Sequence, residues 1–265
     1  MMTTRAEKDN DVQAGRSGPV DHGVYVYGIL NQRQRLPEEL PSVGDQEAAV
    51  KLVSHGELSA LVSEVELVRP LGIREDLLAH ERVLDTLAAD TAVIPMRFGA
   101  VVSSVDAVVD ELLAPHHDHF EAMLSELAGS VQYTIRGRYA DSAHIREVVA
   151  EEPAVQELRE TLRGVPEEAG YAERLRLGEL VNQAVVRKRE ADTEELITSV
   201  SSTVLATNPH QVPAEDDAVD VAFLVDRDQV PQFEQAVDEL GERWDRRINL
   251  RLIGPLAPYD FLPEV

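Results

Sequence analysis

The chain has 265 residues, of which 43% are hydrophobic and none is cysteine. This length suits one large domain or two smaller ones, and the lack of thiols excludes disulfides, thiolate metal sites and cysteine nucleophiles. The net charge of -24 repels phosphate backbones and anionic lipid surfaces, which argues against nucleic-acid and membrane partners.

The first segment is polar and has no apolar core. Residues 1–22 read MMTTRAEKDNDVQAGRSGPVDH, and they predict a disordered leader rather than a secretory signal. No later stretch approaches the roughly 18 uninterrupted apolar residues that a transmembrane helix requires.

The segments that follow the leader mix strand and helix patterns. Residues 24–30, VYVYGIL, predict a strand, and residues 48–53 and 58–65 predict a β-hairpin that turns at Gly56. Residues 73–91 have the periodicity of an amphipathic helix. The apolar stripe expected on this helix consists of Ile73, Leu77, His80, Leu84 and Leu87.

The segment VIPMRFGAVV, residues 93–102, places an arginine inside an apolar run. Pro95 has no N–H, so the segment is expected at a sheet edge or in an extended connection. Strict alternation puts Arg97 and Gly99 on one side and Phe98 on the other. We therefore expect Arg97 to have a structural role, in which a carboxylate or backbone carbonyls hold its guanidinium group.

Two more helices are expected before the end of the N-terminal part. Residues 103–113 predict a helix in which Ser103 and Asp106 have the spacing of a capping box. Residues 117–127 predict another helix, which ends near Gly129.

The C-terminal part contains the clearest supersecondary unit. Residues 219–225 predict a strand, residues 227–244 a helix and residues 249–253 a second strand, which make a βαβ unit. Together with the strand expected for residues 131–139, this unit predicts a split βαβ arrangement, a modified ferredoxin-like domain.

The predicted fold class is therefore α+β with two domains. Residues 23–129 form an N-terminal mixed α+β domain, and residues 130–265 form a C-terminal ferredoxin-like domain with a helical insertion and a C-terminal tail. The long helix of the insertion begins at Tyr171, and residues 207–217 are expected to form a loop.

The sequence carries no nucleotide-binding or hydrolase fingerprint. His80 titrates near neutrality and is a candidate general base. On an apolar stripe, however, a core histidine bonded to a backbone carbonyl is the favoured interpretation. Carboxylates are too numerous for any one pair to stand out as a general acid and base.

The best metal candidate is HHDH at residues 116–119. His116, His117, Asp118 and His119 offer imidazole and carboxylate ligands, but only the first and last have the i, i+3 spacing that one helix face requires. A polar helix start is therefore favoured, and no metal or cofactor is predicted.

Two arginines and two aromatic residues complete the candidates. Arg174 and Arg176 are expected to be surface neighbours of acidic residues on the long helix. Tyr259 and Phe261, in the C-terminal segment GPLAPYDFLPEV, are expected to pack back onto the domain; if exposed instead, they would form a peptide-docking patch.

Four segments together resemble the gas vesicle protein F/L family. They are VYVYGIL near the start, VIPMRFGAVV after the first long helix, YAERLRLGELV on the central helix and GPLAPYDF near the end. The resemblance covers residues 23–265. The residues that it marks as family-motif or interaction residues are Pro95, Arg97, Phe98, Gly99, Tyr171, Arg174, Gly178, Gly254, Pro255, Tyr259 and Phe261.

The resemblance implies a non-enzymatic accessory protein of gas vesicles, with a ferredoxin-like C-terminal domain. It further implies a location in the cytoplasm and on the inner, gas-facing side of the vesicle shell. The implied partners are the small hydrophobic shell protein and other gas vesicle accessory proteins, with assistance to nucleation and assembly. A highly charged partner that covers apolar surface would keep such a shell protein from aggregating.

Two other hypotheses remain open at this point. One is an enzyme on a ferredoxin-like scaffold that uses His80 and Arg97, which requires both side chains to converge in an open pocket. The other is a metal-binding or small-ligand regulatory module that uses His116, His117 and His119.

Overall fold

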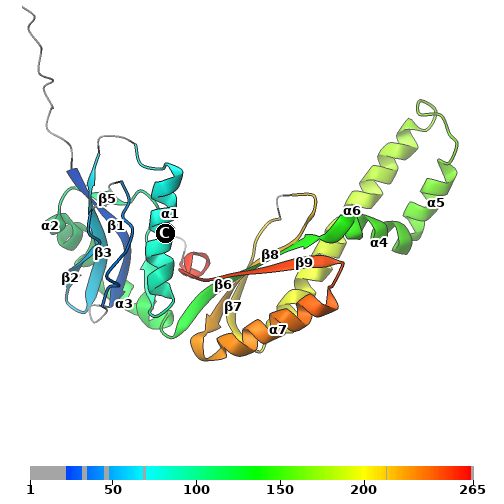
Figure 1. Ribbon diagram of the computed structural model, residues 1–265. Coiled ribbons are helices and arrows are strands. Elements are labelled where there is room, and N and C mark those ends of the chain that lie inside the picture. Colours follow the sequence, from blue (N-terminus) through cyan, green and yellow to red (C-terminus); the bar gives the residue numbers. More distant parts are fainter. Residues whose placement is uncertain (1–21, 32–34, 45–47, 68–69, 213, 264–265) are drawn as a thin grey trace, which may run out of the picture.

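In the computed structural model, two antiparallel β-sheets lie in separate halves of the molecule, and a helical arm projects away from the second sheet (Figure 1). The structure describes residues 22–31, 35–44, 48–67, 70–212 and 214–263. Apart from His22, the predicted leader lies outside the described residues.

The N-terminal half consists of a five-stranded sheet and its covering helices. Its strands are β1 (His22–Asn31), β2 (Lys51–His55), β3 (Leu58–Glu66), β4 (Val93–Pro95) and β5 (Val101–Val102). Its helices are α1 (Arg74–Ala88), α2 (Val105–Ala107), the π-helix η1 (Val108–Leu113) and α3 (His117–Glu126).

The C-terminal half consists of a four-stranded sheet, helices that cover one face of it, and the helical arm, into which the longest of these helices extends. Its strands are β6 (Ser130–Tyr139), β7 (Val204–Pro209), β8 (Asp217–Asp226) and β9 (Ile248–Leu256). Its helices are α4 (Ala143–Glu151), α5 (Pro153–Thr161), α6 (Tyr171–Val200) and α7 (Val230–Arg243), with short 3₁₀ turns η2 (Ala140–Ser142), η3 (Arg227–Gln229) and η4 (Tyr259–Phe261).

Strand β1 is the centre of the first sheet, which explains why VYVYGIL is apolar on both faces. It pairs with β3 on one side and with β4 and β5 on the other. Tyr25 and Tyr27 pack against α1, whereas Val24 and Val26 pack against η1 and α3. A strand that helices cover on both faces lacks the usual polar alternation.

The second sheet has the order β7-β8-β6-β9. Strands β8 and β9 are each antiparallel to β6, so they run parallel to each other without pairing. The predicted βαβ unit is therefore present in its split form, with β6 between its two strands. Helices α6 and α7 cover one face, where Phe233, Leu240 and Leu196 join the core.

Several local predictions are wrong in detail. Ser104 rather than Ser103 caps the helix after β5, because its side chain accepts a hydrogen bond from the N–H of Ala107. Ile73 and Leu77 are exposed, so the apolar stripe of α1 covers only its later turns. The start of the expected loop at residues 207–217 instead belongs to β7.

Two features hold the halves together. The guanidinium group of Arg227 donates to the carbonyls of Ala89, Thr91 and Ser130, and the segment after β9 lies between the two sheets (Figure 1). In the part of the chain that the structure describes, no helix is long and apolar enough to cross a membrane.

Candidate partner-binding surface

The C-terminal segment packs back onto the molecule, as its proline-rich sequence predicts. The N–H of Ala257 donates to Asp85 Oδ1 of α1 at 2.8 Å, and Phe261 packs against the core beneath η1 and α3. Residues 254–261 are called the tail from here on. The tail thus joins the two sheets, while Tyr259 remains 40% exposed.

His80 is the buried contact between α1 and the tail. Its Nδ1 lies 2.9 Å from the hydroxyl of Tyr25, and its Nε2 lies 2.7 Å from the hydroxyl of Tyr259. The residue is 2% exposed, and burial lowers its pKa to about 4 despite a hydrogen bond with the backbone of Met96. A neutral ring has one N–H, so it donates to one tyrosine and accepts from the other.

His210 holds the tail to the second sheet. Its Nδ1 lies 2.9 Å from Asp220 Oδ1, and its Nε2 lies 2.8 Å from Asp260 Oδ1. Because carboxylates only accept, both ring nitrogens donate when the ring is protonated, and the site therefore favours the cation. Burial lowers the pKa of His210, but the hydrogen bonds to the two carboxylates outweigh this effect and raise it above the ordinary value.

The peptide Gly254–Pro255 is cis, and Gly254 has a φ of 150°. A Cβ at Gly254 would lie 2.5 Å from the ring of Tyr133. Only glycine therefore allows β9 to cross this close to β6 before it turns into the tail.

The VIPMRFGAVV segment lies at the edge of the first sheet, as Pro95 predicts. Strands β4 and β5 both pair with β1, and the residues between them form a short excursion at which the N–H of Gly99 donates to the Tyr25 hydroxyl at 3.1 Å. Phe98 packs with the α1 core, on the opposite side from Ile94, because the excursion breaks the alternation.

Arg97 is exposed, so the expected structural role is wrong. Among the described residues, no carboxylate or carbonyl binds its guanidinium group. The enzyme hypothesis also loses its basis, because His80 is enclosed by tyrosines while Arg97 faces solvent.

The candidate metal ligands at residues 116–119 do not all come together. His117, Asp118 and Glu121 bring ligand atoms within 4.8 Å of one another, whereas His116 and His119 stay outside this group. The two carboxylates are exposed and lie in the first turn and a half of α3. Such a group is common at helix starts without a metal.

The family segment YAERLRLGELV lies far from the other three, on the arm of α4, α5 and α6 (Figure 1). The arm has a small core of its own, formed by Val148, Val155, Ala184 and Val185. At its base the buried Asp192 accepts from the Tyr139 hydroxyl at 2.7 Å and from Arg247 at 2.6 Å.

Arg174 has a different role from the one that its acidic neighbours predict. Its guanidinium group donates to the carbonyls of Val165, Pro166 and Glu167, at 2.7, 3.2 and 2.9 Å. Arg174 therefore fixes the turn that leads from α5 into α6, rather than forming an ion pair on the helix surface.

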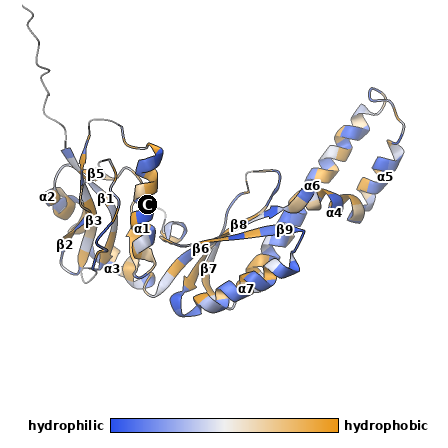
Figure 2. Cartoon of the chain, viewed as in Figure 1, coloured by the Kyte–Doolittle hydropathy of each residue, from blue (hydrophilic) through white to orange (hydrophobic). Residues whose placement is uncertain are grey.

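The arm exposes apolar side chains along one side of α6. Tyr171 is 70% exposed, Leu175 57% and Val186 43%. Positions 171, 175, 178, 182 and 186 share one helix face, since steps of three and four residues return to the same side. Gly178 lies within this face with open space beside it. Figure 2 shows apolar residues recurring along α6 out into the arm.

The comparisons with known proteins agree with this architecture. The family model described as "Gas vesicle synthesis protein GvpL/GvpF" matches residues 23–263. Gas vesicle protein F of Streptomyces sp. (strain CB03234) is 36% identical over 245 residues, which cover 90% of this chain and 98% of that protein. Gas vesicle protein L1 of Halobacterium salinarum is 26% identical over 280 residues, or 97% and 96% of the two chains.

Solved structures show the same fold. The crystal structure of GvpF from Anabaena sp. PCC7120 has a TM-score of 0.79 at 23% identity, over 92% of this chain and 99% of that chain. GvpF from Microcystis aeruginosa has a TM-score of 0.72, also at 23% identity, over 90% and 98% of the two chains. The family model and the Streptomyces relative place the chain among the proteins of gas vesicle formation. It belongs to the GvpL/GvpF family.

Proposed function

We propose that this protein is a non-enzymatic accessory factor of gas vesicle assembly, which binds the small hydrophobic shell protein and keeps it from aggregating before and during nucleation. Membership of the GvpL/GvpF family supports the link to gas vesicle formation. In this proposal the protein first binds the shell protein in the cytoplasm. It then stays in the finished shell, at the gas-facing inner surface.

The exposed apolar face of α6 is the observation that carries this proposal. Tyr171 and Leu175 are adjacent on that face and more than half exposed, at the start of α6, where the arm projects away from both sheets (Figure 1). Contiguous exposed apolar residues mark interaction sites in soluble proteins. The net charge of -24 would keep a complex with a sticky partner dispersed.

We further propose a division into two domains at residues 129 and 130, the second of them a modified ferredoxin-like domain. The largest core cluster of the second half draws all its residues from positions 131–248. The chain order β6, helices, β7, β8, α7, β9 is that of a β-α-β-β-α-β fold. The arm is then the helical insertion of this domain.

The test is a mixture of the purified protein with the shell protein. Light scattering should show slower aggregation of the shell protein, and the two proteins should co-sediment. The double variant Tyr171→Ser/Leu175→Ser should lose both effects. Leu205→Ser is the matched control, because Leu205 is 60% exposed but lies on β7 instead of the arm.

Two outcomes would count against the proposal. If the wild-type protein neither slows aggregation nor co-sediments, the shell protein is not the partner. If the arm variant and the Leu205→Ser control behave alike, the arm is not the binding surface.

A further inference from the structure

The two edges of the second sheet are treated differently. At the β7 edge, the side chain of Asn208 donates to the carbonyl of Asp260, so the tail covers part of this strand. At the β9 edge, no described strand pairs with the outer side. An uncovered edge presents unpaired N–H and C=O groups and is a template for another strand.

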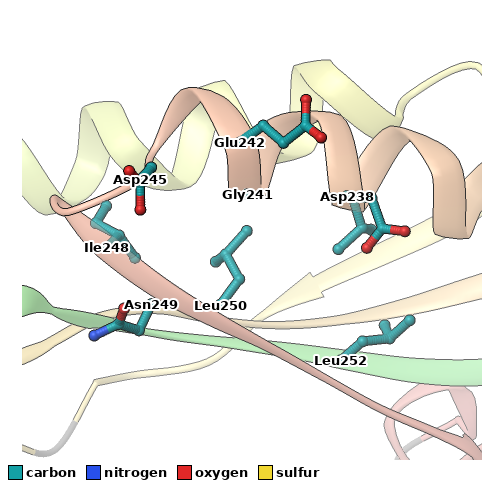
Figure 3. A pocket seen from close by; sticks show the side chains of 9 residues that line it. Asp238, Gly241, Glu242, Asp245, Ile248, Asn249, Leu250 and Leu252 are labelled. Carbon is teal, nitrogen blue, oxygen red and sulfur yellow. The ribbon is translucent and has the colours of Figure 1, made fainter.

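A groove runs along this open edge, between α7 and β9 (Figure 3). Its volume is about 740 Å³, within the size range of ligand-binding clefts. Leu250 and Leu252 of β9 lie in it and are only half-buried, since α7 does not cover them completely. Gly241 of α7 faces the groove, and a Cβ there would meet nothing within 4 Å.

The helix side of the groove is acidic. Asp238, Glu242 and Asp245 line it. Asp245 has an exposed ion pair with its neighbour Arg246 at 3.5 Å. Within the described part of the chain, Asp238 and Glu242 accept no side-chain hydrogen bond and have no cationic partner.

We infer that this groove binds an extended, arginine- or lysine-bearing segment of a partner protein, which adds to β9 as a fifth strand. An added strand would lie about 4.8 Å from β9 and take up its free backbone groups. On the α7 side, the aliphatic stems of the basic side chains would cover Leu250 and Leu252. Their cationic ends would then reach the carboxylates of α7.

The charges of the groove disfavour two other occupants, a second copy of this chain and a purely apolar segment. A second copy of this chain that paired β9 with β9 would bring two acidic rims together, which is repulsive. A purely apolar segment would cover the leucines but would leave Asp238 and Glu242 without partners. The inference concerns a surface separate from the arm and does not depend on the shell protein as its ligand.

The probe is a synthetic peptide of nine residues, the length of β9, that alternates arginine with valine and has blocked ends. One control peptide carries glutamate in place of arginine, and another carries a central proline that removes a backbone donor. We expect the first peptide alone to bind and to slow the hydrogen exchange of amides in residues 248–253, as measured by NMR.

Variants of α7 separate the groove from general attraction to an acidic protein. Gly241→Leu should abolish binding without loss of stability, because the new side chain fills the groove and suits a helix better than glycine. Asp238→Lys/Glu242→Lys should weaken binding about tenfold or more. Glu239→Lys changes charge on the same helix outside the groove, and should leave affinity within about twofold.

Three results would overturn the inference. They are equal binding of the proline peptide, protection that maps outside β9, and unchanged affinity of Gly241→Leu. Failure of the wild-type protein to bind the shell protein, or unchanged binding by the arm variant, would not affect any of them, so the two proposals stand or fail separately.

Discussion

The tail junction and the helical arm use their side chains in opposite ways. In the junction, polar groups are enclosed and paired: His80 lies between two tyrosine hydroxyls, and His210 lies between two carboxylates. On the arm, Tyr171 and Leu175 are apolar and face solvent. The difference separates a part that stabilises the fold from a part that we propose to bind a partner, so that substitutions in each part should have different consequences.

Acid should destabilise the protein through His80, and this is the largest effect expected in the junction. Burial lowers the pKa of His80 to about 4 in the folded state. Above the unfolded-state pKa of about 6.5 the ring is neutral in both states, so its protonation does not affect stability. As the pH falls from about 6.5 towards 4, the unfolded state binds more protons, and on the order of 3 kcal/mol is lost.

Urea unfolding at several pH values checks this expectation. His80→Gln can still donate and accept towards the tyrosine hydroxyls but does not titrate, so its stability should fall less over the same interval. If the free energy of unfolding changes equally with pH in the two proteins, His80 does not control the acid response.

Removal of the Asp260 carboxylate should be nearly as costly. It accepts from Gln132 as well as from His210, and Asp260→Ala leaves both donors without their partner. We expect a loss of about 2 kcal/mol in denaturant unfolding, less than for a fully buried pair because the side chains are partly exposed. Asp245→Ala, which removes an exposed carboxylate, should change stability by less than about 0.5 kcal/mol.

The His210 pair should also weaken at high pH. Its pKa is raised in the folded state, so its contribution is complete below the unfolded value of about 6.5. The contribution is lost as the pH rises through the folded pKa. The melting temperature of the wild type should therefore approach that of His210→Gln between neutral and alkaline pH. A gap between the two that stays constant would contradict the cationic state of the ring.

The smallest effects are expected where side chains face solvent. Arg97→Ala and Leu175→Ser should each change the free energy of unfolding by less than about 0.5 kcal/mol. Only the second should reduce binding to the shell protein. A large stability loss in Arg97→Ala would restore the structural role that its apolar surroundings suggest, and thermal melting of the two variants decides this.

Local pattern was enough to locate most of the elements. The strand at residues 24–30, the hairpin at Gly56 and the helix at residues 117–127 lie where periodicity places them. Errors occur where a contact distant in sequence overrides the local signal. The alternation of the VIPMRFGAVV segment fails because β4 and β5 pair with different parts of β1, with an excursion between them.

The candidate site was less predictable than the fold. Three of the four family segments, VYVYGIL, VIPMRFGAVV and GPLAPYDF, meet around Tyr25 and His80, whereas YAERLRLGELV lies on the arm. No sequence pattern pointed to His210 or Asp260, because each lies in an irregular segment that lacks helix or strand periodicity. Arg227 was expected only as a helix start, and its three backbone partners come from the connection between α1 and β4 and from the first residue of β6.

The amino-acid sequence by itself determined where the chain forms strands and helices, which side chains are apolar enough for the core, and which family the protein resembles. Only the tertiary structure decided which polar groups meet. His80 and Tyr259 are separated by 179 positions, and hydropathy and spacing carry no information about a hydrogen bond at that distance. The same holds for the exposed face of α6 and the open edge of β9, because burial depends on what the rest of the chain leaves uncovered.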